Sequence, residues 1–351
     1  MIILFFSDLH IHHTHRFSHI TSDGKTVREL EHLMCGTKVA QLIEEYNVDR
    51  VVFGGDLFGP VGDNLSTQCL DTACTFVKTI ASACKQRNIQ FDMLVGNHDI
   101  SGHLNNQYSH KLCAFQYWEN VNVYADPIVV GNFVYMPYCT QDAYAENFLD
   151  GIKDKEDKIV FSHLELKNIY LGNGILSQKG VDVNKLDEFK ITLQGHYHNG
   201  GKYGKKVYVS GSTQRLSFKD QGIARNNILI YDTDKNKVVR ESFDCPDWLT
   251  FTDNNIEDIL KASSNNYVRV EVSMDVLLTD EIKAKIETFL GADVHVDVNR
   301  ISVNKKIDSE SDYQVESEID VIKSFIQRSD NDEQQKEALL QEGMSLIKKF
   351  Q

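Results

Sequence analysis

Five short motifs in the first part of the chain carry side chains that bind metal ions. They are D-x-H, G-D, G-N-H-D, a single His after an apolar run, and G-H-Y-H. The candidate ligands in them are Asp8, His10, Asp56, Asn97, His163, His196 and His198. Carboxylate, amide oxygen and imidazole form a mixed set, which suits Mn, Fe or Zn better than an all-oxygen Mg or Ca cage or a thiolate site. Any one of these residues alone is typical of a strand-end hydrogen bond, but the complete ordered set predicts a metal centre.

The number of candidate ligands indicates two metals rather than one. A catalytic metal must keep a position open for substrate, and seven ligands are too many for one such ion. If Asp56 bridges, each of two metals receives four protein ligands and keeps room for water and substrate. Glycines precede Asp56, Asn97 and His196, and they allow the backbone to turn sharply where each strand ends.

Short apolar runs must position these ligands. They alternate with amphipathic stretches up to about Phe243, which is the pattern of an α/β domain. The runs are Ile2–Phe6, Val51–Phe53, Met93–Val95, Phe133–Met136, Ile159–Phe161, Ile191–Leu193 and Val207–Val209. Four of them lead directly into candidate ligands. Ligands at the carboxyl ends of adjacent strands meet at one edge of a sheet, so we expect the metal centre there.

The pattern changes between Cys245 and Phe251, which predicts a domain boundary. Alternating valines from Tyr267 to Ser273, a helix with Thr279 as its N-cap, and an apolar run near Val294 then predict a small β-α-β unit. The end of the chain has two stretches with apolar residues at helical spacing. The three predicted parts are a catalytic domain at 1–245, a capping domain at 246–307 and a helical partner-binding segment at 308–351.

The ordered motifs resemble the signature of the calcineurin-like metallophosphoesterases, and the resemblance spans residues 8 to 198. It implies an α/β fold in which two sheets form a sandwich flanked by helices. It also implies that two divalent ions, with Mn²⁺ favoured and Mg²⁺ as the alternative, activate a water and neutralise phosphate charge. The implied ligands are Asp8, His10, Asp56 and His198 for the first ion, and Asp56, Asn97, His163 and His196 for the second. His98 is implied beside the scissile phosphate, with Asp99 as its orienting partner.

The whole architecture is similar to the SbcD-type nuclease subunit, in the compact form found in phage recombination endonucleases. This resemblance implies a nuclease of DNA repair, recombination or replication, with 3′-to-5′ exonuclease activity on duplex DNA and endonuclease activity on single strands. The implied partners are DNA and an SbcC-like coiled-coil ATPase, with the nuclease as a homodimer within the complex. The chain departs from relatives in a long His-rich loop from Ile11 to Arg28 and in Gly59, where relatives often carry an acid.

The net charge of −14 argues against a general DNA-binding surface, but its distribution is uneven. Residues 308 to 342 hold eleven acids against three bases, so this tail supplies −8 of the −14. Basic residues gather after the G-H-Y-H motif, and the candidates for DNA contact are Lys202, Lys205, Lys206 and Arg215. We expect the three lysines near the metals, although an ordinary solvated hairpin remains an equal alternative.

No apolar run approaches the roughly 20 residues of a membrane span. The seven cysteines include no C-x-x-C pair, which indicates reduced thiols. We therefore expect a cytoplasmic protein without membrane association, in a bacterium or a phage-infected bacterium.

Two other functions stay open: a stand-alone phosphodiesterase or phosphatase acting on nucleotides or proteins, and a scaffold that keeps metals only for stability. His12, His13 and His15 are interpreted as a polar loop near the site rather than as extra ligands.

Overall fold

The computed structural model describes residues 1–12, 20–22, 24–59, 65–104, 107–169, 176–218, 227–272 and 278–289. Several predictions fall outside this range: the apolar run near Val294, the helical segment at 308–351, and His13 and His15. The division into three parts therefore stays a prediction. No helix in the described part of the chain combines the length and apolar character that a membrane crossing needs.

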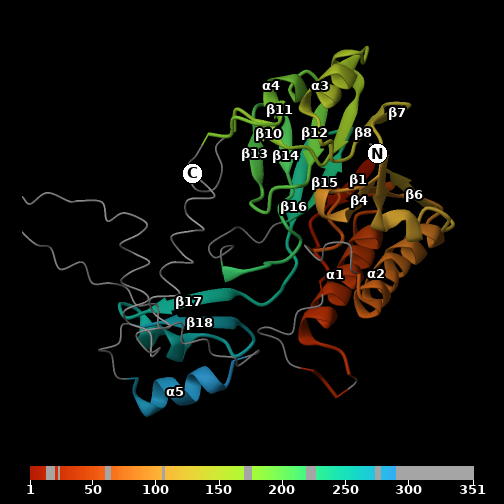
Figure 1. The fold of residues 1–351 in the computed structure, drawn as a ribbon. Helices are drawn as coiled ribbons and strands as arrows, with labels where there is room; N and C mark the ends of the chain where they lie inside the picture. Colours follow the sequence, from red (N-terminus) through yellow and green to blue (C-terminus); the bar gives the residue numbers. More distant parts are fainter. Residues whose placement is uncertain are drawn as a thin grey trace, which may run out of the picture. The chain divides into compact units, whose positions relative to one another are not determined.

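Two six-stranded sheets form the centre of the fold (Figure 1). The first has the order β16-β15-β1-β2-β3-β6, and the second has the order β13-β14-β12-β9-β8-β7. The first contains β1 (Ile2–Phe6), β2 (Arg50–Phe53), β3 (Phe91–Leu94), β6 (Val121–Tyr124), β15 (Ile228–Asp232) and β16 (Lys237–Glu241). The second contains β7 (Ile128–Val130), β8 (Phe133–Met136), β9 (Ile159–Ser162), β12 (Ile191–Gln194), β13 (Gly201–Tyr203) and β14 (Val207–Val209). All the predicted apolar runs are strands of these sheets.

Strand direction determines where the ligands gather. In the first sheet β1, β2, β3 and β6 are parallel, while β15 pairs antiparallel with β1. In the second sheet β14, β12, β9 and β8 are parallel, while β13 and β7 run antiparallel at the two edges. The parallel strands of each sheet therefore end at one common edge.

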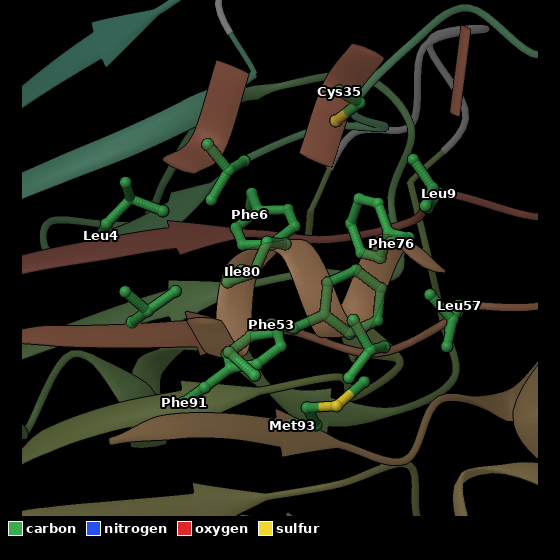
Figure 2. Packing of buried hydrophobic residues seen from close by; sticks show 14 of the residues in the cluster. Leu4, Phe6, Leu9, Cys35, Phe53, Leu57, Phe76, Ile80, Phe91 and Met93 are labelled. Carbon is green, nitrogen blue, oxygen red and sulfur yellow. The ribbon is translucent and has the colours of Figure 1, made fainter. Parts of the chain in front are cut away.

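Two long helices cover the outer face of the first sheet. They are α1 (Val27–Glu45) and α2 (Thr67–Gln86). A capping box begins α1, because Thr26 Oγ1 accepts from the Glu29 amide at 3.2 Å and Glu29 Oε2 accepts from the Thr26 amide at 2.6 Å. Beneath these helices Phe6 packs against Phe53 and Phe76, with ring centroids 5.2 and 6.2 Å apart (Figure 2).

The two sheets pack face to face, and short helices cover the second one. Phe5 of β1 stacks on Phe161 of β9, and these rings belong to a core that draws residues from both sheets. A separate core lies between the second sheet, α3 (Asp142–Asp150) and α4 (Val183–Leu186). This helix-sheet-sheet-helix order confirms the predicted α/β sandwich.

The remaining elements are short. They are the strands β4 (Ile100–Leu104), β5 (Gln107–His110), β10 (Leu166–Lys167) and β11 (Val181–Asp182), with 3₁₀ helices η1 (Asn97–Asp99), η2 (Lys111–Ala114), η3 (Lys155–Asp157) and η5 (Ile256–Lys261). All seven cysteines are free thiols, as predicted, and Cys35, Cys69 and Cys84 are buried.

A small unit with its own core follows the sandwich. It contains β17 (Trp248–Thr252), which pairs in parallel with β18 (Tyr267–Glu271), and α5 (Asp280–Glu287). Thr279 caps α5 as predicted, with its side chain accepting from the Ile282 amide at 3.3 Å. Within the predicted boundary region, Trp248 and Phe251 are buried residues of β17.

Candidate metal centre

The loops that follow strands of both sheets bring all the predicted ligands to one edge. Three groups have ligand atoms that all lie within 4.8 Å of one another. They are Asp8 with His10 and His198, His10 with Asp56 and His98, and Asp56 with His163 and His196. The Asp8 amide donates to Gly55 O at 2.9 Å within the first sheet, and the Gly195 amide donates to Ser162 O at 2.9 Å within the second. Between the sheets, the His196 amide donates to Asp8 Oδ2 at 3.0 Å. The centre therefore lies where the two sheets meet.

Four of the predicted ligands have left-handed backbone, which L-amino acids with side chains seldom adopt. The φ angles are 57° for Asp8, 51° for His10, 58° for Asp56 and 72° for His196. Such conformations cost free energy and persist where surrounding contacts hold them, often at functional sites. Here main-chain hydrogen bonds between neighbouring loops hold these conformations, since the His10 amide donates to Asp56 O at 3.1 Å.

The first group contains an unsatisfied buried oxygen. Asp8 Oδ2 accepts from Ser7 Oγ and from the His196 amide, but among the described residues its buried Oδ1 has no hydrogen-bond partner. His10 Nε2 lies 3.1 Å from His198 Nε2 and 3.7 Å from this oxygen. Two imidazole nitrogens on one cation, each bound at about 2.0–2.1 Å, lie roughly 3.3 Å apart. An uncompensated carboxylate oxygen beside such a pair fits a divalent cation.

The second ligand group is Asp56, His163 and His196 with Asn97 beside it, and its Asp56 also faces His10 of the first group. Asp56 Oδ2 lies 3.3 Å from His163 Nε2 and 3.6 Å from His10 Nε2, so it faces both groups. Asn97 Oδ1 lies 3.2 Å from His163 Nε2 and 3.0 Å from His196 Nδ1. His163 Nδ1 is 2.6 Å from Gly54 O and donates to it, which leaves Nε2 as the ligand atom. These contacts fit the bridging role predicted for Asp56.

Neighbouring charges shift the pKa values of this group in opposite directions, so a cation binding at His163 Nε2 would displace a proton. Burial raises the pKa of Asp56, but the neighbouring imidazoles of His163 and His10 outweigh burial and hold the pKa below its usual value. Burial lowers the pKa of His163, while Asp56 raises it to about 9. Burial and the charge of His163 together lower the pKa of His196 to about 4, so this imidazole stays neutral and can act as a ligand.

A family model for calcineurin-like phosphoesterases matches residues 1–200. The chain belongs to this family. It is therefore a hydrolase of phosphate esters that depends on divalent metals, and the residue groups above could hold those metals. No curated protein matches the chain.

Several solved structures are similar to the chain at low identity. TT1561 of Thermus thermophilus is 12% identical, with 69% of this chain and 98% of that chain covered and a TM-score of 0.39. The E. coli phosphoesterase Yfce is 12% identical, with 70% and 100% covered and a TM-score of 0.31. The Pseudomonas putida nuclease MPE is 14% identical, with 59% and 66% covered and a TM-score of 0.25. Likenesses this distant do not indicate a substrate.

Asp99 forms hydrogen bonds with other groups than the His98 ring, which was predicted as its partner. Its Oδ2 accepts from the amides of Asp56 and Gly96 at 2.9 and 3.0 Å, and its Oδ1 accepts from the Phe58 amide at 3.1 Å. Its hydrogen bonds in the described structure thus go to the main chain rather than to the His98 ring. Burial and the Asp56 carboxylate raise the pKa of Asp99 to about 7. In this phosphoesterase Asp99 is a positioning residue that joins the turns after β2 and β3.

His98 is held by its main chain beside the first group. Its amide donates to Asp56 Oδ1 at 2.8 Å, its carbonyl accepts from Lys111 Nζ at 2.7 Å, and its ring lies 5.0 Å from the His10 ring. This geometry is compatible with a substrate-facing role and also with a ligand role. His12 lies in none of the metal groups found among the described residues, and its Nδ1 is 2.8 Å from His10 O.

The predicted DNA contacts are only partly near the metals. Lys202 is exposed on β13 and pairs with Tyr208 in the middle of β14, so it lies closer to the metal edge than the hairpin tip does, and its Nζ lies 5.1 Å from the centroid of the Tyr208 ring. Lys205 and Lys206 lie at the tip of the β13–β14 hairpin, where Lys206 O accepts from the amide of Thr192 at the start of β12. The four residues of β12 span roughly 13 Å, and His196 follows the other end of β12.

The expectation that all three lysines lie near the metals is thus wrong for two of them, because β13 reverses the chain direction. Lys206 Nζ instead donates to Phe189 O at 2.8 Å. Arg215 forms an ion pair with Asp247 at 3.0 Å, which offsets its charge.

Sequence reasoning also missed two residues beside the ligands. Ser7 donates to Asp8 Oδ2 and lies 2.7 Å from Ser210 Oγ, and both serines are fully buried. Tyr138 places its ring centroid 6.1 Å from that of His196. The F-S-D run indicates a role for Ser7, since a hydroxyl directly before a buried ligand can hydrogen-bond to that ligand and orient it. Tyr138 follows a strand that leads into no ligand motif and had no such signal.

Replacing Gly96 by Ala is expected to damage the centre. A Cβ there would lie 2.2 Å from Asp56 Oδ1 and 2.3 Å from Asp56 N, so the Asp56 turn must move. We expect a loss of about 1–3 kcal/mol in unfolding free energy and at least roughly tenfold weaker Mn²⁺ binding, measured by denaturant unfolding and calorimetry. Gly151→Ala is the control, because its Cβ would find its nearest neighbour at 3.5 Å. Equal metal binding by both variants would contradict the close approach.

Proposed function

We propose that this metallophosphoesterase is a DNA nuclease, the SbcD-type subunit of a complex with an SbcC-like coiled-coil ATPase. The observation that carries the proposal is the complete ligand set with Asp56 facing both groups, followed in the chain by a small unit with its own core. A phosphodiester has one negative charge and a poor leaving group, and two cations suit its hydrolysis. The predicted order of catalytic domain, capping domain and helical segment, which resembles that nuclease family, supports the proposal.

The residues have separate roles in the proposed reaction. Asp8, His10, Asp56 and His198 would hold one divalent cation, and Asp56, Asn97, His163 and His196 would hold the other. When bound, the two cations supply positive charge to the phosphoryl group and lower the pKa of the attacking water. His98 would donate a hydrogen bond to the phosphate or a proton to the leaving oxygen. Asp99 and the Gly54 carbonyl would keep Asp56 and His163 in position.

Mn²⁺ is the cation we propose, with Mg²⁺ as the alternative. Four imidazoles contribute to the two sites, and nitrogen ligands favour Mn²⁺ over Mg²⁺, which prefers oxygen. The test is cleavage of end-labelled duplex and single-stranded DNA in each metal, with and without the ATPase partner. We expect Mn²⁺-dependent release of nucleotides from 3′ ends of duplex DNA and internal cuts in single-stranded circles.

Two outcomes of the same assay would reject the proposal. Hydrolysis of bis(p-nitrophenyl) phosphate without DNA cleavage would favour a stand-alone phosphodiesterase. Binding of metal without any turnover would favour a scaffold in which the metals serve stability.

Lys202→Ala is expected to weaken DNA binding, whereas Lys205→Ala is not. Both lysines are exposed on the same hairpin, but only Lys202 lies toward the metal edge. Each phosphate neutralised contributes about −0.9 to the slope of log K against log salt, so the Lys202 variant should have a shallower slope by about this amount. Fluorescence anisotropy with several DNA sequences measures it, and equal slopes for both variants would remove Lys202 from the DNA contacts.

Removal of residues 315–351 is expected to abolish binding of the ATPase and to spare Mn²⁺-dependent cleavage by the subunit alone. The apolar spacing of this segment, with Val315, Ile319 and Ile322 at helical intervals, requires a surface to cover. Size-exclusion chromatography with the ATPase and a thermal melt test the change. A lower melting temperature of the isolated truncated protein would show that the segment packs on its own chain instead.

A further inference from the structure

A pocket of about 240 Å³ lies at the edge of the sheets that carries the metal centre. The residues lining it include Ile100, Asp126, Tyr138, Cys139, Gln141 and Tyr144. They come from the segments after η1, after β6 and after β8, and from the first turn of α3. None of them is a candidate metal ligand.

Strand order places this pocket next to the second ligand group. The strand β6 is the parallel neighbour of β3, which leads to Asn97, and β8 is the parallel neighbour of β9, which leads to His163. The segments after β6 and β8 therefore emerge beside those two ligands, and they contribute Asp126 and Tyr138 to the pocket. The Tyr138 amide donates to Val95 O at 2.9 Å, which ties the two sheets together at this point.

Tyr138 is the residue shared by the pocket and the centre. It lines the pocket, and its ring centroid lies 6.1 Å from the ring of His196 at an interplanar angle of 32°. A substrate whose phosphate lies at the metals would therefore have an adjoining group within reach of Tyr138. Tyr144 adds a second aromatic ring, and half of its surface is exposed, at 50%.

The residues that line the pocket indicate which kind of substrate group could bind there. Asp126 is the one charged side chain among the described residues that line the pocket, and no Lys or Arg is among them. A negative carboxylate without a compensating cation disfavours a second phosphate. Aromatic rings, a carboxylate acceptor and the Gln141 amide instead suit a flat neutral ring that carries N–H donors. The volume is below the 300 Å³ or more typical of drug-sized ligands, so it suits a single ring system.

We propose that this pocket binds the nucleobase of the nucleotide whose phosphate is hydrolysed at the metal centre. The inference rests on the proposed nuclease function for the identity of the substrate. Tyr138 and Tyr144 contact the base by stacking, which tolerates any base, since every base has a π face. Asp126 accepts from the exocyclic amino group of adenine or cytosine, a group that thymine lacks. Efficient cleavage then requires the base beside the scissile phosphate to leave the base stack and bind in the pocket.

The first experiment uses Mn²⁺-loaded protein and single-stranded oligonucleotides that carry either a base or an abasic site at the nucleotide next to the scissile phosphate. We expect the wild type to have a KM lower by roughly tenfold for the base-bearing substrate, within the range of base stacking on aromatic rings. Tyr144→Ala should raise KM for that substrate to the abasic level. Tyr117→Ala is the control, because this tyrosine is 87% exposed and does not line the pocket. Equal KM values for both substrates in the wild type would overturn the proposal.

Asp126→Asn provides an independent variant on an exposed side chain. It should reduce the preference for adenine or cytosine over thymine at the same nucleotide, and an unchanged preference would overturn the role of Asp126. If the wild type cleaves no DNA, the proposed function fails, and the pocket is then tested by calorimetry with deoxyadenosine monophosphate and deoxyribose 5-phosphate. Roughly tenfold tighter binding of the nucleotide, lost in Tyr144→Ala, supports the pocket. Equal binding of the two ligands overturns it.

Discussion

Asp56→Asn is expected to abolish phosphodiester hydrolysis and to weaken the binding of both metal ions. Oδ2 of this carboxylate faces His163 at 3.3 Å and His10 at 3.6 Å, so it is the proposed shared ligand of the two groups. A neutral amide has no negative charge to offset the positive charge of the two cations. Metal ions supply several kcal/mol of transition-state stabilisation, so we expect a rate loss on the order of 10⁴-fold or more. Metal titration by calorimetry and turnover in Mn²⁺ measure the two effects.

The choice of Asn keeps the variant folded. Asp56 has φ of 58°, and Asn tolerates this left-handed backbone, whereas Ala at the same position adds strain. The Asn oxygen can also accept the hydrogen bond that the His98 amide donates to Asp56 Oδ1 at 2.8 Å. Asp71→Asn on α2 is the matched control, because its side chain is exposed. Binding of two metals with wild-type affinity by Asp56→Asn would show that this residue does not bridge them.

His98→Ala is expected to keep both metals and to lose about 10²- to 10⁴-fold in turnover. The loss follows if the ring donates a hydrogen bond or a proton to the substrate. Metal binding has to be measured beside turnover, since His98 forms a group with His10 and Asp56 and could also be a ligand. Metal content and kcat should therefore be measured on the same preparation.

The control for this substitution is His110→Ala. His110 lies on the neighbouring β5 and belongs to none of the metal groups found among the described residues. It should retain turnover and metal content. Loss of manganese from His98→Ala, at a level that His110→Ala does not share, would assign His98 as a ligand instead.

The sheet strands and the ligand types were predictable because both are local properties of the chain. A run such as Ile2–Phe6 is apolar enough to be buried on both faces, and all five of its residues form β1. Five motifs in fixed order indicate a metal centre, since the coordination chemistry of Asp, Asn and His does not depend on the surrounding fold. Net charge and cysteine usage were likewise read directly from the residues.

Backbone geometry and the partners of each polar atom were decided by tertiary structure. Nothing in the sequence around Asp8 or His10 indicates a left-handed φ, because contacts with the loop after β2 hold that conformation. Asp99 follows His98 directly, yet its carboxylate accepts from the amides of Asp56 and Phe58, which are more than forty residues away.

Tertiary structure also decided the positions of the lysines and of the pocket residues. Lys205 is close in sequence to His198, but a hairpin reverses the chain and carries Lys205 to the opposite end of the strand. Asp126 and Tyr138 belong to separate segments without a motif, and parallel pairing of β6 with β3 and of β8 with β9 brings both to the metal edge. The sequence therefore determined which chemistry the chain can perform, while strand order and direction decided which side chains surround it, because neighbours across a sheet are set by long-range pairing.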